Sequence, residues 1–245
     1  MLAVALFLLQ SKETLVHAHA HNDYMHPKPL TTAMSLGYGS IEADFYLVDG
    51  DLLVAHDRDK VKAGKTLDAL YLKPLAEAVR SHKGSAYGDG KAIILLLDVK
   101  ADGAAVVPVL KKQLLRYPDV YGRGKPVVPV VSGDRDIPAI TGDLDKVLAL
   151  DGRPEDIGKD PGAVPLVSDS WGDHFKWVGK GEMPVAEQQA MQDLADRCHK
   201  AGQKLRFWGA PDFEKSWVYQ FKAGCDLVGT DKLEGLSNFL KQSKT

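Results

Sequence analysis

Short apolar runs alternate with helix-like stretches along most of the chain. Several runs are continuous rather than alternating, such as IILLLDV at 93–99, and this is typical of parallel strands that are covered on both faces. Eight strands are predicted in this way: Thr14–Ala20, Ser40–Asp44, Ile93–Val99, Val127–Ser132, Lys146–Leu150, Val164–Ser168, Lys204–Trp208 and Leu227–Thr230.

The stretches between the strands carry apolar residues at helical spacing. Pro74 is expected to kink or break the first of them. Helices are predicted at Thr66–His82, Ala104–Arg116, Val185–Ala201, Phe213–Ala223 and Leu233–Lys241. Strands that alternate with helices predict the α/β class, and their number favours a single (β/α)8 TIM barrel over residues 14–245. A doubly wound open sheet is the alternative.

The composition is that of an ordinary globular protein with one substantial core, since 44% of the 245 residues are hydrophobic and 26% are charged. The net charge is −2 and no basic stripe stands out, so nothing indicates a nucleic-acid partner. Cys198 and Cys225 are too few for a disulfide scaffold and match no zinc motif. One bridge or two buried thiols are both compatible with the sequence.

The first thirteen residues form a separate segment, which begins with the apolar run MLAVALFLL and then turns polar. The run is too short to span a bilayer. It favours an export signal, and therefore a secreted or periplasmic protein, although a basic leader and a clear cleavage site are missing. An N-terminal tail or first strand that packs on the body is the alternative.

Polar residues gather at the trailing ends of the predicted strands, where barrel enzymes carry their chemistry. Glu42 and Asp44 are two residues apart on a strand, so they point to the same face, and Asp98 ends the next strand. With the carbonyl of Asn22 they offer an all-oxygen site for one divalent cation, Mg²⁺ or Ca²⁺ rather than zinc. For the Glu42–Asp44 pair alone, a structural ion pair with Lys or Arg is the alternative.

Histidines lie close to these acids in the sequence. His19 and His21 end the first strand, and the Asp49-Gly50 turn predicts a hairpin that brings His56 back toward the end of the second. A two-residue loop would put His56 on the face opposite Glu42, whereas a three-residue loop would put both on one face. A catalytic role for His56 requires the second arrangement or a longer turn.

Several motifs, taken in order, resemble the barrel phosphodiesterases, which include phosphatidylinositol-specific phospholipases C, glycerophosphodiester phosphodiesterases and spider-venom type phospholipases D. These motifs are HNDY at 21–24, IEAD at 41–44, AHD at 55–57, LLDVK at 96–100, RFWGAPD at 206–212 and GTDKL at 229–233. Within that superfamily, the H-x-H-N-D-Y start is most similar to the uncharacterised altered inheritance of mitochondria protein 6 group. The resemblance covers Val16 to Leu240.

The resemblance implies a role for each matching residue. His21 and His56 would be the catalytic histidines, with His19 a competitor for the first role and a candidate substrate contact. Glu42, Asp44, Asp98 and Asn22 would hold the cation, and Lys100 would bind the substrate phosphate. By their places at strand ends, Trp208 and Arg135 are further candidate substrate contacts. Glycerophosphodiesterases carry His-Arg-Gly where this chain has His21-Asn22-Asp23, which argues against a glycerol phosphate substrate.

The sequence thus predicts a metal-dependent phosphoric diester hydrolase that uses two histidines as general acid and base. We expect a monomer that acts on a phosphodiester or phospholipid-type substrate. The aromatic stretch at 170–177 (SWGDHFKW) either contacts a membrane surface transiently or packs on the barrel as a lid. An amidohydrolase-like barrel hydrolase and a non-catalytic protein that binds a lipid head group are the rival interpretations.

Overall fold

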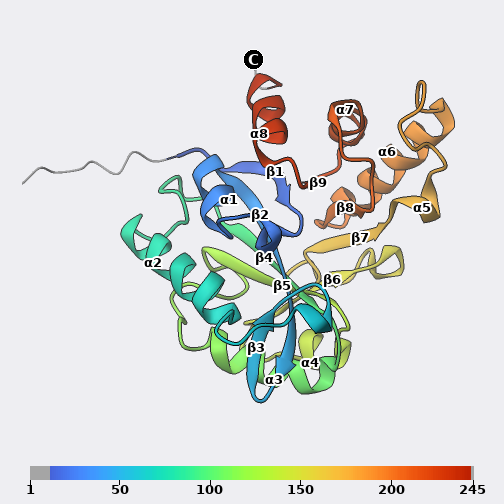
Figure 1. Ribbon diagram of the computed structural model, residues 1–245. Coiled ribbons are helices and arrows are strands. Elements are labelled where there is room, and N and C mark those ends of the chain that lie inside the picture. Colours follow the sequence, from blue (N-terminus) through green and yellow to red (C-terminus); the bar gives the residue numbers. More distant parts are fainter. Residues whose placement is uncertain (1–11, 244–245) are drawn as a thin grey trace, which may run out of the picture.

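The computed structural model describes residues 12–243, and eight parallel strands form its centre (Figure 1). With the antiparallel strand β3 included, the strands are β1 (Leu15–Ala20), β2 (Tyr38–Val48), β3 (Asp51–Val54), β4 (Ile93–Val99), β5 (Val127–Gly133), β6 (Ala149–Gly152), β7 (Leu166–Ser170), β8 (Lys204–Trp208) and β9 (Val228–Thr230). Their order is β8-β7-β6-β5-β4-β2-β1-β9, and β3 pairs antiparallel with β2. A parallel bridge between Arg206 and Leu227 nearly closes the ring, so the predicted TIM barrel is confirmed.

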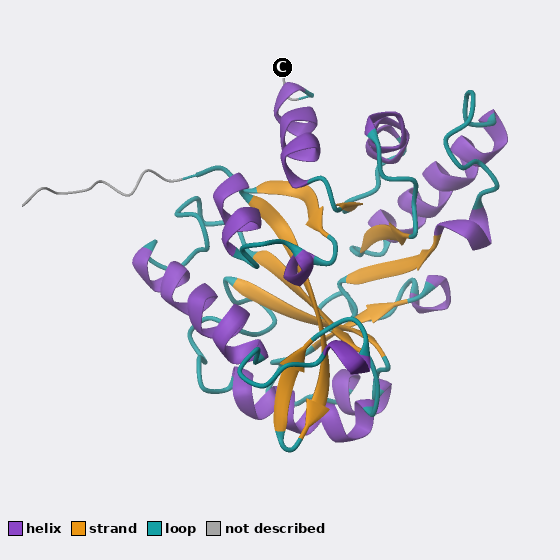
Figure 2. Ribbon diagram, in the orientation of Figure 1, coloured by secondary structure: helices purple, strands orange, loops and turns teal. Residues whose placement is uncertain are grey.

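Helices surround the strands, as Figure 2 shows. They are α1 (Thr31–Leu36), α2 (Lys73–Ser81), α3 (Gly103–Leu114), α4 (Ile137–Thr141), α5 (Trp171–His174), α6 (Val185–Lys200), α7 (Glu214–Lys222) and α8 (Leu233–Gln242). The connection after β6 differs from the expected alternation, because it carries only a 3₁₀ turn at Pro154–Asp156. Pro74 does not break its predicted helix either. It stands in the first turn of α2, directly after a π-helical segment at Asp68–Leu72, and the helical backbone runs through both segments.

The two faces of the strands contact different apolar clusters, and this determines where the polar residues at the strand ends lie. The larger one lies between strands and helices and contains Ile93, Leu95 and Leu97. The smaller one, with Ile94 and Leu96, lies on the other face of β4 and fills the barrel interior. Because side chains alternate along a strand, Asp98 continues the interior row of β4 and reaches the C-terminal mouth.

The aromatic stretch at 170–177 packs on the protein itself. Trp171, Phe175 and Trp177 are all buried and join a second apolar cluster with Met191 of α6 and Phe207 of β8. The indole nitrogen of Trp171 donates a hydrogen bond to the carbonyl of Trp177 at 2.9 Å. The prediction that these rings contact a membrane is therefore not supported. The stretch packs beside the barrel wall rather than closing over its mouth.

The apolar N-terminal segment, predicted as an export signal, lies outside the described residues. Between residues 12 and 243, none of the helices combines the length and the apolar character that a membrane span needs. Cys198 and Cys225 are both free and buried, which decides between the two alternatives that the sequence left open.

Candidate active site

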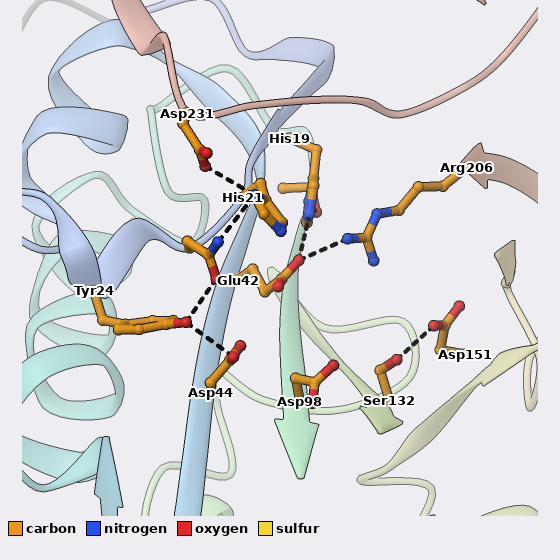
Figure 3. Close-up of polar contacts among 12 residues, drawn as sticks. His19, His21, Tyr24, Glu42, Asp44, Asp98, Ser132, Asp151, Arg206 and Asp231 are labelled. Carbon is orange, nitrogen blue, oxygen red and sulfur yellow. Dashed lines mark hydrogen bonds and ion pairs between the residues drawn. The ribbon is translucent and has the colours of Figure 1, made fainter. Parts of the chain in front are cut away.

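The three predicted carboxylates meet at the C-terminal mouth of the barrel (Figure 3). Glu42 and Asp44 lie on the same face of β2, and the β2–β4 register places Asp44 beside Asp98. One carboxylate oxygen from each residue lies within 4.8 Å of the others. Glu42 and Asp44 are 4% and 2% exposed, so their charges are largely removed from water. The sequence prediction that these acids converge on one point is therefore confirmed.

Buried ion-pair partners surround Glu42. Its Oε2 accepts a hydrogen bond from Nη2 of Arg206 at 2.7 Å and another from Nε2 of His19 at 2.8 Å. Burial alone would raise the pKa of Glu42, but the charge of Arg206, followed by the His19 hydrogen bond, lowers it well below its usual range. Glu42 is therefore ionised. The Arg206 ion pair, which was the structural alternative for this acid, exists alongside the carboxylate cluster.

His19 lies behind Glu42 and is fully buried. Burial, and then the charge of Arg206, lowers its pKa to about 4, so the ring is neutral at physiological pH. A neutral ring that donates from Nε2 to Glu42 must accept at Nδ1, where the hydroxyl of Ser40 lies at 2.8 Å. Both ring nitrogens are thus engaged, and the prediction that His19 contacts substrate is not supported. It positions Glu42 instead.

Asp44 is a buried carboxylate with a raised pKa and one oxygen that is unpartnered within the described residues. Burial raises its pKa to about 6, and the nearby charges of Glu42 and then Asp98 add to the effect. Its Oδ2 lies 2.9 Å from the Tyr24 hydroxyl and 3.2 Å from Nζ of Lys100, whereas its buried Oδ1 has no hydrogen-bond partner among residues 12–243. A buried oxygen without a donor, inside a group of three carboxylates, fits a hard divalent cation.

Asn22, the fourth predicted ligand, lies at the edge of the same cluster. Its Oδ1 is 2.6 Å from the Tyr24 hydroxyl, which also contacts Asp44. Tyr24 has one hydroxyl proton and serves one acceptor at a time, so a lone pair of Asn22 or Asp44 stays available. Asn22 adopts a left-handed backbone at φ 48°, which turns the chain from β1 toward the cavity.

Both predicted catalytic histidines line the cavity that contains the carboxylates, a space of about 320 Å³. Nδ1 of His21 lies 2.8 Å from Oδ1 of Asp231, and Nδ1 of His56 lies 2.7 Å from Oδ1 of Asp57. A carboxylate at Nδ1 favours the proton on that nitrogen and leaves Nε2 for chemistry. Within residues 12–243, neither Nε2 has a hydrogen-bond partner. The prediction that the two rings lie on one side of the molecule is confirmed.

The hairpin brings His56 to the cavity by a different route from the one predicted. Val48 pairs with Asp51, so the loop is the two-residue Asp49-Gly50 turn, with φ of 50° and 87°. That loop was expected to turn His56 away. However, the strand β3 ends at Val54, and the chain is irregular beyond it, so the alternation of faces no longer applies to His56. The condition that His56 reaches the cavity only with a three-residue loop or a longer turn was therefore wrong, although His56 does line the cavity.

Asp231 is a site residue that the sequence reasoning missed as a partner of His21. It follows β9 directly, and β9 pairs with β1, so that the His21 amide donates to the Thr230 carbonyl at 3.2 Å. The backbone nitrogen of Asp231 in turn donates to Oδ2 of Asp212 at 3.1 Å. The signal was present in the GTD motif at the end of the last strand, because closing a barrel brings that strand beside the first one.

The basic residues are placed partly as predicted. Lys100 lines the cavity, with Nζ 3.2 Å from Asp44 and 3.6 Å from Asp98. Burial alone would lower the pKa of Lys100, but the charge of Asp44, followed by that of Asp98, raises it. Lys100 is therefore a cation available to a phosphate group. Trp208 also lines the cavity and is 45% exposed.

Arg135 does not line the cavity, and Arg153 stands there instead. The guanidinium of Arg135 donates to the backbone carbonyl of Asp151, while Arg153 donates to the carbonyl of Gly152 at 2.8 Å. The predicted strand Lys146–Leu150 ended two residues before β6 does in the structure, and Arg153, which directly follows β6, was not among the predicted site residues.

Comparisons with known proteins agree with this geometry. Residues 9–120 match a family described as the AIM6-like phosphodiesterase domain. The chain is 26% identical to altered inheritance of mitochondria protein 6 from Eremothecium gossypii, over 95% of this chain and 71% of that protein. It is 23% identical to the homologue from Arthroderma benhamiae, over 91% of this chain and 83% of that protein.

A solved structure shows the same fold. The glycerophosphodiester phosphodiesterase from Parabacteroides distasonis superposes with a TM-score of 0.57, covering 96% of this chain and 100% of its own, at 16% identity. Together with the matching family, it confirms the resemblance that the motifs indicated. The chain has a TIM barrel similar to that of this glycerophosphodiester phosphodiesterase, and its sequence is similar to the AIM6-like phosphodiesterase domain over residues 9–120 and to the altered inheritance of mitochondria protein 6 group.

Proposed function

We propose that this protein is a phosphoric diester hydrolase that depends on one divalent cation, Mg²⁺ or Ca²⁺, and uses His21 and His56 for proton transfer. The observation that carries the proposal is the convergence of three carboxylates, two histidines and Lys100 on one cavity. The family resemblance to phosphodiesterases supports the bond type. The geometry supports the roles of individual residues.

The carboxylates would hold the cation through Glu42, Asp44 and Asp98, with Asn22 at the edge. When bound, a divalent cation supplies positive charge that stabilises the developing charge on the phosphoryl oxygens. The buried ion pair with Arg206 keeps Glu42 ionised and fixes its direction. The side chain therefore offers a charged oxygen to a ligand without having to lose a proton first.

The two histidines divide the proton transfers. Each has Nδ1 against a carboxylate, so each presents Nε2 as the nitrogen that exchanges a proton. One ring removes the proton from the attacking hydroxyl or water, and the other protonates the departing alcohol oxygen. Lys100, held as a cation by Asp44 and Asp98, binds the anionic phosphoryl group.

The test is hydrolysis of a panel of phosphodiesters, from bis(p-nitrophenyl) phosphate to lysophospholipids, with Mg²⁺, with Ca²⁺ and with chelator. We expect activity with cation and none with chelator. The variants His21→Ala and His56→Ala should each lower kcat by about 100-fold or more. His82→Ala is the matched control, because His82 caps α2 outside the cavity and should retain full turnover.

Other outcomes would favour the rival interpretations. Full diesterase activity in both histidine variants would refute their assigned roles. If no diester is hydrolysed although a head-group phosphodiester binds tightly, a non-catalytic binding protein is favoured instead. An amidohydrolase-like reaction has less support, because His21 and His56 are the only histidines that line this cavity in the described part of the chain.

A further inference from the structure

A second cavity of about 560 Å³ opens beside the first one, and His56 lines both. We call it the side groove. Its walls come from the segment after β1 and from the segment between β3 and α2, two parts of the chain that the barrel brings together. The lining includes Met25, Val54, His56, Lys62 and Lys65.

The side groove has an apolar wall. Met25 is 69% exposed, so its side chain presents apolar surface at the groove. Val54 is 4% exposed and Leu70 is partly buried against the main core, so the base of the wall is fixed by packing. Apolar surface of this kind gains free energy when an apolar group covers it. A polyol arm such as glycerol would gain almost nothing there.

The side groove is also lined by two lysines, Lys62 and Lys65. The backbone nitrogen of Lys65 donates to the carbonyl of Lys62 at 3.2 Å, and Gly64, at φ 83°, closes this turn. The carbonyl of Lys65 accepts from the nitrogen of Val54 at 2.8 Å, which ties the turn to the end of β3. These backbone hydrogen bonds place the turn that carries both lysines beside the groove.

Lys62 and Lys65 have no acidic partner within residues 12–243. The third lysine of the groove, Lys60, differs, because its Nζ lies 3.0 Å from Asp59. Asp57 also lines the groove, and its carboxylate contacts Nδ1 of His56 at 2.7 Å. Within the described part of the chain, the groove therefore offers two lysines without an ion-pair partner beside an apolar wall, and with Asp57, Asp59 and Lys60 included it keeps a net positive charge.

We propose that the side groove binds one ester arm of the substrate, and that this arm is apolar and carries a second anionic group that Lys62 and Lys65 bind. The inference rests on the proposed function and names its substrate class, an amphipathic phosphodiester with a further negative charge. With the phosphate in the central cavity, an arm that passes His56 enters the groove directly. The apolar wall contacts the apolar part of this arm, and Lys62 and Lys65 bind its anionic group.

The experiment compares three p-nitrophenyl phosphodiesters whose second arm is methyl, octyl or ω-carboxyoctyl. All three release the same product, so kcat/KM reports the arm. We expect octyl to exceed methyl by at least about tenfold, since each buried methylene contributes about fourfold. At low salt, the carboxylate should add about a further fivefold, and this second gain should disappear at high salt.

Variants assign the effect to the lysines. In Lys62→Gln/Lys65→Gln, the ratio of kcat/KM between the carboxyoctyl and octyl substrates should fall close to one. In the control Lys112→Gln/Lys222→Gln, which removes two exposed lysines from α3 and α7, that ratio should stay as in the unmodified protein. Replacing Met25 by Gln should reduce the octyl-to-methyl ratio, and replacing it by Leu should preserve that ratio.

The outcomes separate this inference from the function on which it rests. If the methyl diester is hydrolysed but neither longer arm improves kcat/KM, the side groove does not bind substrate and the proposed function stands. If the octyl arm helps and the carboxylate does not, the assignment of the lysines is overturned. If none of the three diesters is hydrolysed with either cation, the proposed function fails and this inference falls with it.

Discussion

Replacing Arg206 by Met tests whether a buried ion pair holds the carboxylate cluster together. Arg206 and Glu42 are each 4% exposed, and their charged atoms are 2.7 Å apart. At that distance and an effective dielectric constant of about 20, the attraction is about 6 kcal/mol. Desolvation offsets part of this, and breaking a buried pair typically costs about 3–5 kcal/mol. We expect a loss of that size in the free energy of unfolding, measured by urea denaturation with chelator.

The loss should depend on pH in a stated direction. In the unmodified protein, the folded pKa of Glu42 is lowered, so its contribution to stability is present above the unfolded pKa and disappears as pH falls through the folded value. In Arg206→Met, the effect of burial on Glu42 dominates and raises its folded pKa above the unfolded value. Stability is then lost as pH rises through this raised folded pKa. The deficit of Arg206→Met should therefore be larger at about pH 7.5 than at about pH 5.

Two further variants serve as controls. Arg80→Met removes an exposed arginine that pairs with Asp119 at 2.7 Å, and it should cost far less, because solvent screens that pair. Adding Glu42→Gln to Arg206→Met should restore much of the lost stability, since no unpaired charge stays buried. A deficit below about 1 kcal/mol, or one that is equal at both pH values, would refute the reasoning.

Three other predictions follow from the same geometry. If His21 transfers protons as proposed, Asp231→Asn should lower kcat by about tenfold with little change in KM, because it removes the carboxylate beside Nδ1 of His21, and steady-state kinetics would show it. Both cysteines should react with Ellman's reagent only after unfolding, since burial raises the pKa of each thiol, whereas rapid labelling of the folded protein would contradict this. Gly133→Ala should weaken cation binding in calorimetry, because its Cβ would lie 2.6 Å from Asp98 Oδ1 and 2.3 Å from the Val99 carbonyl. Gly124→Ala is the control, because Gly124 has a φ of 74°, close to the 72° of Gly133, and a Cβ there would have no atom within 4 Å. Equal effects of the two substitutions on cation binding would exclude the steric explanation.

The sequence was sufficient for features that depend on local pattern. Glu42 and Asp44 share a face because they are two apart on a strand, and Asp98 joins them because β2 and β4 are parallel neighbours in register. The continuous apolar run at 93–97 is buried on both faces of its strand, as in the parallel sheets of α/β folds. Burial of these residues therefore favours the parallel arrangement that brings Asp98 beside Asp44.

The features that were missed depend on contacts between distant segments or on strand ends. Asp231 reaches His21 only because the last strand closes onto the first, which no local pattern records. Arg153 was missed because the predicted strand at 146–150 ended two residues before β6 does, so Arg153 did not stand at a predicted strand end. From its place at the end of the first strand, His19 was predicted to contact substrate. In the structure it is hydrogen-bonded to Glu42, which also pairs with Arg206 of β8, a residue distant in the sequence.

Isothermal titration of the protein with Ca²⁺ or Mg²⁺ measures cation binding by the carboxylate cluster without requiring the substrate to be known. We expect one bound cation per chain, abolished by Asp98→Asn and unaffected by Asp119→Asn on the surface. Asp98 is the better target than Glu42, because Glu42 also pairs with Arg206 and its loss would disturb the core. Absence of binding, or binding that Asp98→Asn leaves intact, would contradict the assignment of these carboxylates as one cation site.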